Sequence, residues 1–158
     1  MTAKQRFDLE ALTPGAEDAI GTLDTYIAKL KLDAPLLELI RVRASQINGC
    51  TYCIDMHTKD ARARGDTEQR LYALSAWREA PFFTDRERAA LAWTEALTLV
   101  SEGQVPDAVY AEVRSQFSEA EVAGLLLVII AINAWNRVAI SQRLQAGKYV
   151  SPYGKART

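Results

Sequence analysis

Apolar residues recur at helical spacing from early in the chain. Over residues 17–32 they lie three and four positions apart, at Ile20, Leu23, Ile27 and Leu30. This repeat places the apolar side chains on one face of a helix that can pack against a core. The first long helix is therefore predicted at about residues 17–32.

Two more helices are predicted directly after it. Asp33 can accept hydrogen bonds from the first N–H groups of a helix over residues 34–48, and Pro35 has a backbone angle suited to its first turn. Gly49 can adopt the left-handed conformation that ends this helix. The next helix is expected to begin at or near residue 50 and to stop at residue 65, so the two should form a tight hairpin.

Capping and turn signals indicate four further helices. Two of them start with the Ser/Thr and Glu pair of a capping box. The predicted spans are about 67–78, 85–100, 107–117 and 119–145. The tail, residues 147–158, contains Pro152 and Gly154 among basic residues and is expected to be extended or loosely ordered.

The predicted fold class is all-α, with about six to seven helices and no sheet. We find no alternating strand pattern, no repeat and no linker between domains, so the prediction is a single domain over residues 1–158. A length of 158 residues is enough to bury a substantial core without a disulfide or metal. The chain's two cysteines are therefore free for chemistry.

Charge and hydropathy exclude several classes of partner. The net charge is -1, with acidic and basic residues interspersed, so neither a nucleic-acid stripe nor a polybasic membrane anchor is expected. The first ten residues lack the apolar core of a signal peptide, and we expect a cytoplasmic protein. The most apolar run, residues 122–134, is too short to span a bilayer and is predicted to be a buried core helix.

The residues with redox or acid–base potential gather between residues 38 and 57. Cys50 and Cys53 form a Cys-X-X-Cys pair, and His57, the one histidine of the chain, follows four positions later. On a helix these three side chains fall within an arc of roughly 60° on one face. If the hairpin is antiparallel, Glu38 lies near enough for its side chain, with one water, to reach His57.

These residue types suit thiol chemistry. A thiolate is the reactive form of cysteine, and a helix N-terminus can lower the pKa of a thiol beside it. His57 could take a proton from either thiol, and Glu38 could orient the imidazole. Cys50 and Cys53 could close a disulfide after modest backbone adjustment. Position relative to the helix end alone favours Cys50 as the nucleophile.

The pattern of Glu38, Cys50-X-X-Cys53 and His57 resembles the alkylhydroperoxidase (AhpD-like) core of the carboxymuconolactone decarboxylase superfamily. The close likeness covers about residues 38–100. The resemblance implies an all-helical subunit that assembles into trimers or hexamers. It also implies antioxidant thiol peroxidase activity, of the peroxiredoxin type, with a lipoyl-bearing protein as the dithiol reductant; a thioredoxin-like donor is equally compatible with the chemistry.

The resemblance also implies a role for each residue. Cys53 would be oxidised to sulfenic acid by the hydroperoxide. Cys50 would donate a proton and then close the disulfide, while Glu38 and His57 would act as a proton relay. Tyr52 stands where some relatives carry a second histidine, and relatives that decarboxylate muconolactones generally lack the cysteine pair.

Other interpretations of the same residues stay open. Cys50, Cys53, His57 and Glu38 could bind a metal, although three ligands on one short helix face make tetrahedral closure awkward. The chain could be a non-catalytic redox sensor, or it could decarboxylate or isomerise a small lactone without the cysteines. Asp55 is expected to face solvent beside Lys59, outside the site. We expect no metal and no cofactor, because no haem, flavin or nucleotide motif is visible.

Overall fold

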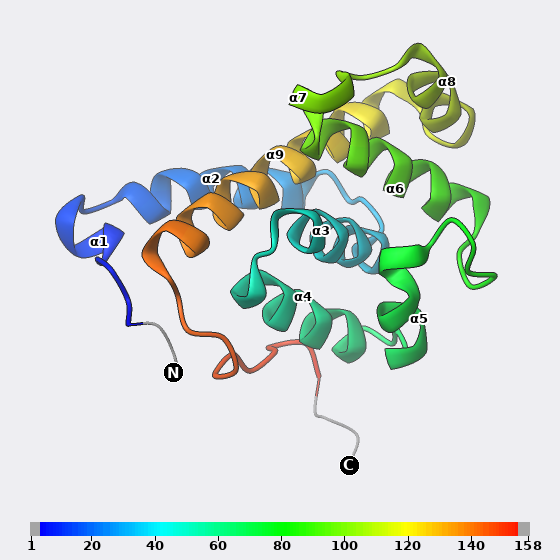
Figure 1. The fold of residues 1–158 in the computed structure, drawn as a ribbon. Helices are drawn as coiled ribbons and strands as arrows, with labels where there is room; N and C mark the ends of the chain where they lie inside the picture. Colours follow the sequence, from blue (N-terminus) through cyan, green and yellow to red (C-terminus); the bar gives the residue numbers. More distant parts are fainter. Residues whose placement is uncertain (1–3, 155–158) are drawn as a thin grey trace.

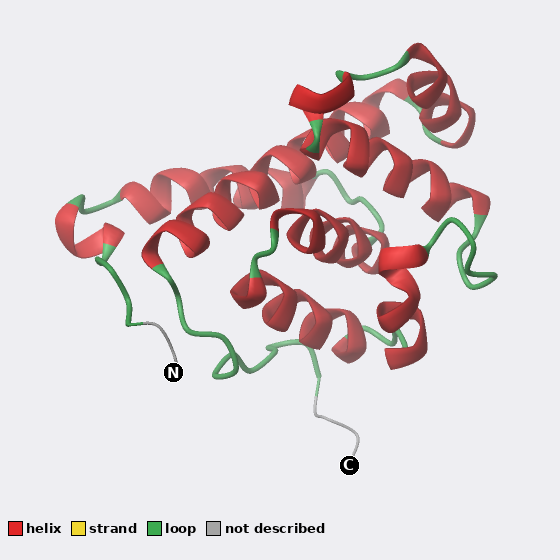
Figure 2. Cartoon of the chain, viewed as in Figure 1, coloured by secondary structure: helices red, strands yellow, loops and turns green. Residues whose placement is uncertain are grey.

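The computed structural model describes residues 4–154, and within that range it contains nine α-helices, one short 3-10 helix and no strand (Figure 2). The all-α prediction is confirmed, but the helices outnumber the six or seven predicted. The elements are α1 (Leu9–Leu12), α2 (Ala16–Lys29), α3 (Ala34–Asn48), α4 (Thr51–Ala63), α5 (Glu68–Ala73), the 3-10 helix η1 (Leu74–Ala76), α6 (Asp85–Thr98), α7 (Val100–Gly103), α8 (Asp107–Gln116) and α9 (Glu119–Gln142).

Helix α3 lies at the centre of the molecule. It packs most extensively against α4, α9 and α6, and α2 runs alongside α9 (Figure 1). Eight of its residues are buried, because neighbours surround it on several sides. A helix so enclosed can hold polar side chains away from bulk water.

The predicted start and end of α3 are confirmed. The Asp33 carboxylate accepts a hydrogen bond from the Leu36 N–H at 3.1 Å. Gly49 ends the helix in the left-handed conformation, with φ 70°. Cys50 follows directly as the N-cap residue of α4, so the two helices form the predicted tight hairpin.

Several predicted boundaries need correction. The helix predicted over 67–78 ends at Ala73 and tightens into η1, and its apolar residues Leu71, Leu74 and Trp77 are buried. Helix α9 stops at Gln142 rather than 145, because Arg143 adopts a left-handed conformation. The one-turn helices α1 and α7 were not predicted, since four residues are too short to show periodicity.

Helix α9 is longer than its most apolar run. By length and composition alone it could cross a membrane, and 44% of its most apolar window is buried within the subunit. Its core side packs with α2, α3 and α6 through residues that include Leu125, Val128 and Ile129. The prediction of a buried core helix therefore holds for this side of α9.

Candidate active site

The hairpin of α3 and α4 brings Glu38 and His57 into direct contact. His57 Nδ1 lies 2.9 Å from Glu38 Oε2, so the bridging water expected from the sequence is not needed. An ionised carboxylate only accepts hydrogen bonds, so Nδ1 of the neutral ring carries the hydrogen. Nε2 is then the ring nitrogen left to exchange a proton with another group.

His57 and two arginines keep Glu38 ionised although only 2% of the residue is exposed. Arg41 Nη1 lies 2.9 Å from Glu38 Oε1, and Arg64 Nε lies 3.8 Å from the same oxygen. Burial raises the pKa of Glu38, but the hydrogen bond from His57 and the charges of Arg41 and Arg64 outweigh it, so the pKa is lowered. Glu38 is therefore a fixed negative charge beside the imidazole.

The two thiols lie in contact at the start of α4. Their sulfur atoms are 2.9 Å apart, and both cysteines are buried and free. Cys50 has the extended backbone of an N-cap residue, so the predicted single helical face holds for Cys53 and His57 but not for Cys50. The N-cap position of Cys50, rather than a shared helix face, places its sulfur against that of Cys53.

The contact makes the two thiols unequal in acidity. A hydrogen bond from Cys53 lowers the pKa of Cys50 to about 7, against the effect of burial; the N–H groups of Cys53 and Tyr52 and the Asn136 side chain help. The hydrogen bond to Cys50 and burial raise the pKa of Cys53 above its ordinary value. The first proton therefore leaves easily from Cys50, whereas a second ionisation is disfavoured.

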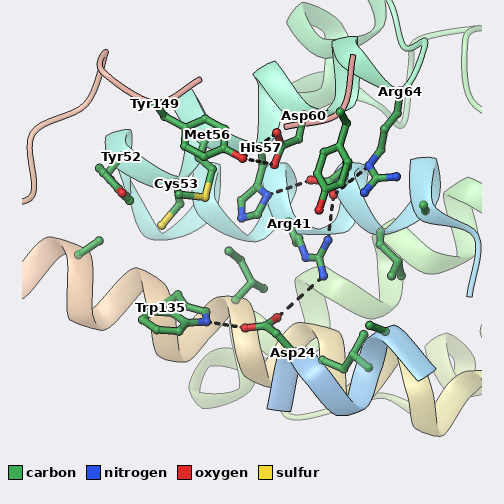
Figure 3. Close-up of a pocket in the computed structure, with 18 of the residues that line it drawn as sticks. Asp24, Arg41, Tyr52, Cys53, Met56, His57, Asp60, Arg64, Trp135 and Tyr149 are labelled. Atoms are coloured by element: carbon green, nitrogen blue, oxygen red, sulfur yellow. Dashed lines mark hydrogen bonds and ion pairs between the residues drawn. The ribbon is translucent and has the colours of Figure 1, made fainter. Parts of the chain in front are cut away.

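A cavity of about 640 Å³ places Cys53, His57 and Glu38 along one wall. Figure 3 shows Cys53 and His57 projecting from α4 toward it, with Trp135 and Asp24 on the opposite side. Both cysteines pack in the apolar cluster next to the cavity, but Cys53 lines the cavity and Cys50 does not. The two thiols thus differ: Cys50 is the more acidic, and Cys53 faces the space where a substrate can enter.

The remaining walls come from helices far apart in the sequence. Trp135 Nε1 on α9 donates to Asp24 Oδ2 on α2 at 2.7 Å, and Arg41 Nη2 lies 3.9 Å from Asp24 Oδ1. Arg41 therefore links the two opposite walls. The apolar part of the lining includes Ile27, Leu32, Leu37, Ile132, Val138 and Leu144.

The C-terminal tail closes one side of the cavity. The Tyr149 hydroxyl donates to the buried Asp60 carboxylate, with oxygen distances of 2.9 and 3.0 Å. Burial and that carboxylate raise the pKa of Tyr149. Arg64 stacks on the Tyr153 ring, 3.6 Å from its centroid. The tail through Gly154 is extended, as predicted, but these contacts show that it is not loosely attached; residues 155–158 lie outside the described range.

Asp55 lies outside the cavity and anchors the tail. It forms the expected i,i+4 ion pair with Lys59 at 2.9 Å and accepts a hydrogen bond from the Gly147 N–H. Lys59 donates to the Tyr149 carbonyl oxygen at 3.0 Å. These contacts tie the tail to α4 beside the site.

Sequence reasoning missed Asp60, Arg64, Asn136 and the tail tyrosines as neighbours of the site. Asn136 carried a usable signal, because an amide in a long apolar helix needs buried partners. The others carried none, since their approach depends on how the tail folds back over α4.

A metal site from both cysteines, His57 and Glu38 is not the cluster that the fold assembles. Among the described residues, the potential ligand atoms that converge within 4.8 Å belong to Glu38, His57 and Asp60. Their carboxylates already bind the His57 ring, Arg41 and Tyr149. Two guanidinium groups next to them oppose a cation.

The model of the carboxymuconolactone decarboxylase family matches residues 14–96, a span that contains all four predicted site residues. The chain belongs to this family. The match begins at residue 14, whereas the motif predicted a close likeness that begins at about residue 38. An uncharacterized family relative, YdfG of Bacillus subtilis (strain 168), is 41% identical over 137 residues, which cover 87% of this chain and 93% of YdfG.

Solved structures support the resemblance to AhpD-like members of the family. ATU0492 of Agrobacterium tumefaciens, a protein of unknown function described as a candidate antioxidant defence protein AhpD, has a TM-score of 0.89 and 38% identity. The match covers 92% of this chain and all of ATU0492. A peroxidase-related protein from Silicibacter sp. TM1040 has a TM-score of 0.72 and 25% identity, covering 83% of this chain and 70% of its own.

Replacing Tyr149 by Phe tests the contact between the tail and α4. The change removes the hydroxyl that donates to a buried carboxylate, so the free energy of unfolding should fall by about 1–3 kcal/mol. Tyr72→Phe is the matched control, because Tyr72 also donates to a carboxylate, that of Glu68, but is exposed. Its effect should stay within about 0.5 kcal/mol. Equal losses in denaturant unfolding would contradict the tail packing described here.

Proposed function

We propose that this protein is a thiol-dependent hydroperoxide reductase that cycles Cys53 and Cys50 between dithiol and disulfide. The observation that carries the proposal is the pair of sulfur atoms 2.9 Å apart, one of them on the cavity wall that also holds His57 and Glu38. This arrangement combines a nucleophile on the cavity wall, a second thiol behind it to resolve the product, and a proton carrier. Membership of the family is consistent with an enzyme.

Access decides which sulfur attacks. Cys53 lines the cavity, so a hydroperoxide can reach it without displacing core residues. The proton of Cys53 can move to the Cys50 thiolate across 2.9 Å or to His57 Nε2. Cys50, which has the lower pKa, thus serves as the proton acceptor for the Cys53 thiol. Its position at the helix end favours ionisation of Cys50, which is compatible with attack by Cys53.

The reaction balances over two steps. Cys53 thiolate attacks the outer peroxide oxygen, the O–O bond breaks, and an alcohol leaves after taking the proton from Cys50 or His57. The Cys50 sulfur then attacks the Cys53 sulfenic acid, forming the disulfide and releasing water. One hydroperoxide is reduced to an alcohol and water as the dithiol loses two hydrogens.

The shape and lining of the cavity favour an organic hydroperoxide. Its volume of about 640 Å³ is far more than hydrogen peroxide needs, and much of its wall is aliphatic or aromatic. An alkyl or aryl group would bury apolar surface there, at about 25 cal/mol per Å². The substrate is therefore proposed to be an alkyl hydroperoxide.

Partners and location are proposed together with the activity. Cys50–Cys53 disulfide reduction needs an external dithiol, for which a lipoyl-bearing or thioredoxin-like protein is proposed, in the cytoplasm. Assembly into a trimer or hexamer is proposed as well. Ile130 and Ile140, exposed on α9, are apolar residues that such an interface could cover.

A cysteine-independent reaction is the second candidate. Glu38 orients His57 so that Nε2 is free, and this pair could abstract a proton from a small lactone or related acid without either thiol. Activity of this kind would survive replacement of both cysteines by serine.

Turnover of the cysteine variants tests the proposal. With an organic hydroperoxide and either dihydrolipoamide or reduced thioredoxin, Cys53→Ser and Cys50→Ser should each abolish multiple turnovers, because the disulfide cannot form. His57→Ala should lower the rate by about 10²–10⁴-fold, the usual contribution of a general acid–base group. The consumption of hydroperoxide measures all three.

Asp55→Asn is the control for turnover, since Asp55 lies on the same helix but outside the cavity. It should retain most of the rate. Wild-type turnover by Cys53→Ser would overturn the dithiol mechanism.

The unequal acidity of the two thiols predicts how they titrate. Because the pKa of Cys50 is lowered to about 7, one thiolate should form as pH rises between about 6 and 8 and should be lost below that range. Thiolate absorbance of the reduced protein, minus that of a variant with both cysteines replaced by serine, measures this directly. Cys50→Ser should remove the titration near 7, and a wild-type midpoint at the ordinary value of about 8.5 would contradict the arrangement.

A further inference from the structure

Asn136 on α9 is a buried amide beside the thiols. The residue is 0% exposed, and its neighbours on α9, Ile132 and Ala139, pack in the same buried cluster as both cysteines. Its side chain lowers the pKa of Cys50 and of Cys53. It comes from a helix distant in sequence from the Cys-X-X-Cys segment. The question is whether the amide presents its oxygen or its N–H groups to the sulfur atoms, since only an N–H stabilises a thiolate.

A chain of amides fixes the answer, beginning at Asn133. Its Nδ2 donates to the Ile129 carbonyl oxygen at 2.9 Å, and a carbonyl can only accept. Its Oδ1 therefore faces the other way, where Arg137 Nη1, which can only donate, lies 3.2 Å away. Both contacts assign the same orientation to Asn133.

Asn48 on α3 links the orientation of Asn133 to that of Asn136. Its Nδ2 donates to Asn133 Oδ1 at 3.0 Å and to Asn136 Oδ1 at 2.8 Å. Asn136 Oδ1 is thus occupied, and its Nδ2 must point the opposite way. There it donates to Ser45 Oγ at 3.0 Å, which leaves one N–H of the amide for sulfur.

We infer that Asn136 is a positioning residue for the thiol reaction: its oriented amide N–H holds the sulfur atoms of Cys50 and Cys53 in place and stabilises whichever carries the negative charge. The inference rests on the proposed function in that the thiols carry the reaction. Asn136 acts through the thiols and lies behind the groups that line the cavity.

This role is suited to a charge that moves between two sulfur atoms. A neutral donor stabilises a thiolate without forming a salt bridge that would hold the charge on one of them. The Asn136 side chain lowers the pKa of both cysteines, whereas their mutual contact acts on them in opposite directions. The amide thus favours the anion of the pair as a whole.

Other charges around the site are separate from this contact. The titratable groups that line the cavity with Cys53 are Glu17, Asp24, Glu38, Tyr52, His57, Asp60, Tyr149 and Tyr153, with the cations Arg41 and Arg64. Arg137, on α9 itself, is exposed and bonded to Asn133. A change at Asn136 leaves all of these in place.

The test is the thiolate titration of reduced Asn136 variants. Asn136→Asp replaces the N–H donor by an acceptor of similar shape and should raise the midpoint by at least about one pH unit, a tenfold smaller thiolate to thiol ratio at a given pH. Asn136→Leu removes the donor without adding charge and should raise the midpoint less. Asn48→Leu should raise it as well, because the orientation of Asn136 is then no longer imposed.

Gln142 supplies the matched control. It is also a buried amide on α9, but its oxygen accepts a hydrogen bond from the Leu9 N–H at 2.7 Å. Gln142→Glu and Gln142→Leu should lower stability while leaving the thiol midpoint where it is in the wild type. A purely structural role for Asn136 would give the same result at both positions.

The readout separates this inference from the proposed function, because the titration needs no peroxide. A raised midpoint in folded Asn136→Leu or Asn48→Leu supports the inference even in a protein that fails to reduce hydroperoxides. A wild-type midpoint in either folded variant overturns it, even in an active peroxidase. If Asn136→Asp does not fold, the Asn48→Leu result decides.

Discussion

The buried carboxylate of Glu38 is the constraint on which the site depends. A carboxylate at 2% exposure is costly unless charged or hydrogen-bonding partners surround it. Those partners come from two helices: Arg41 from α3 itself, and His57 with Arg64 from α4 and its end. Satisfying one carboxylate therefore fixes how α4 lies along α3, and the cysteines at the start of α4 follow from that alignment.

Helix α9 supplies the second support of the site. Its apolar side packs into the core, while Asn133 and Asn136 form a chain of amide hydrogen bonds to Asn48 and Ser45 of α3, next to the thiols at the start of α4. A polar network of this kind is stable only when every member has a partner. The same network orients the amide that faces the sulfur atoms, so the packing and the thiol chemistry depend on each other.

Much of the hairpin could be predicted because its signals are local. Asp33 and Pro35 mark the start of α3 and Gly49 marks its end, through contacts with residues nearby in the sequence. The spacing of Cys53 and His57 places both on one face of α4. Cys50 departs from that face because the residue before a helix has extended backbone. Its position in contact with Cys53 could not be read from helical periodicity.

The rest of the site depends on tertiary contacts that no local pattern encodes. Tyr149 reaches Asp60 across 89 positions in the chain, and Asn136 reaches Ser45 across 91. Periodicity shows which side of α9 faces the core, but not which residue lies opposite each amide. The composition of the tail predicts an extended or loosely ordered segment, and its contacts with Asp55, Asp60 and Arg64 could not be predicted without the fold.

Mapping the first oxidation product tests the account most directly. Reduced protein is treated with one equivalent of an organic hydroperoxide and digested for mass spectrometry, beside a Cys50→Ser sample that cannot resolve the intermediate. We expect rapid loss of two hydrogens at Cys50 and Cys53 in the wild type, and sulfenic acid on Cys53 in the variant. Thiols that stay reduced for minutes, or a sulfenic acid that forms on Cys50 in a Cys53→Ser sample but never on Cys53, would contradict it.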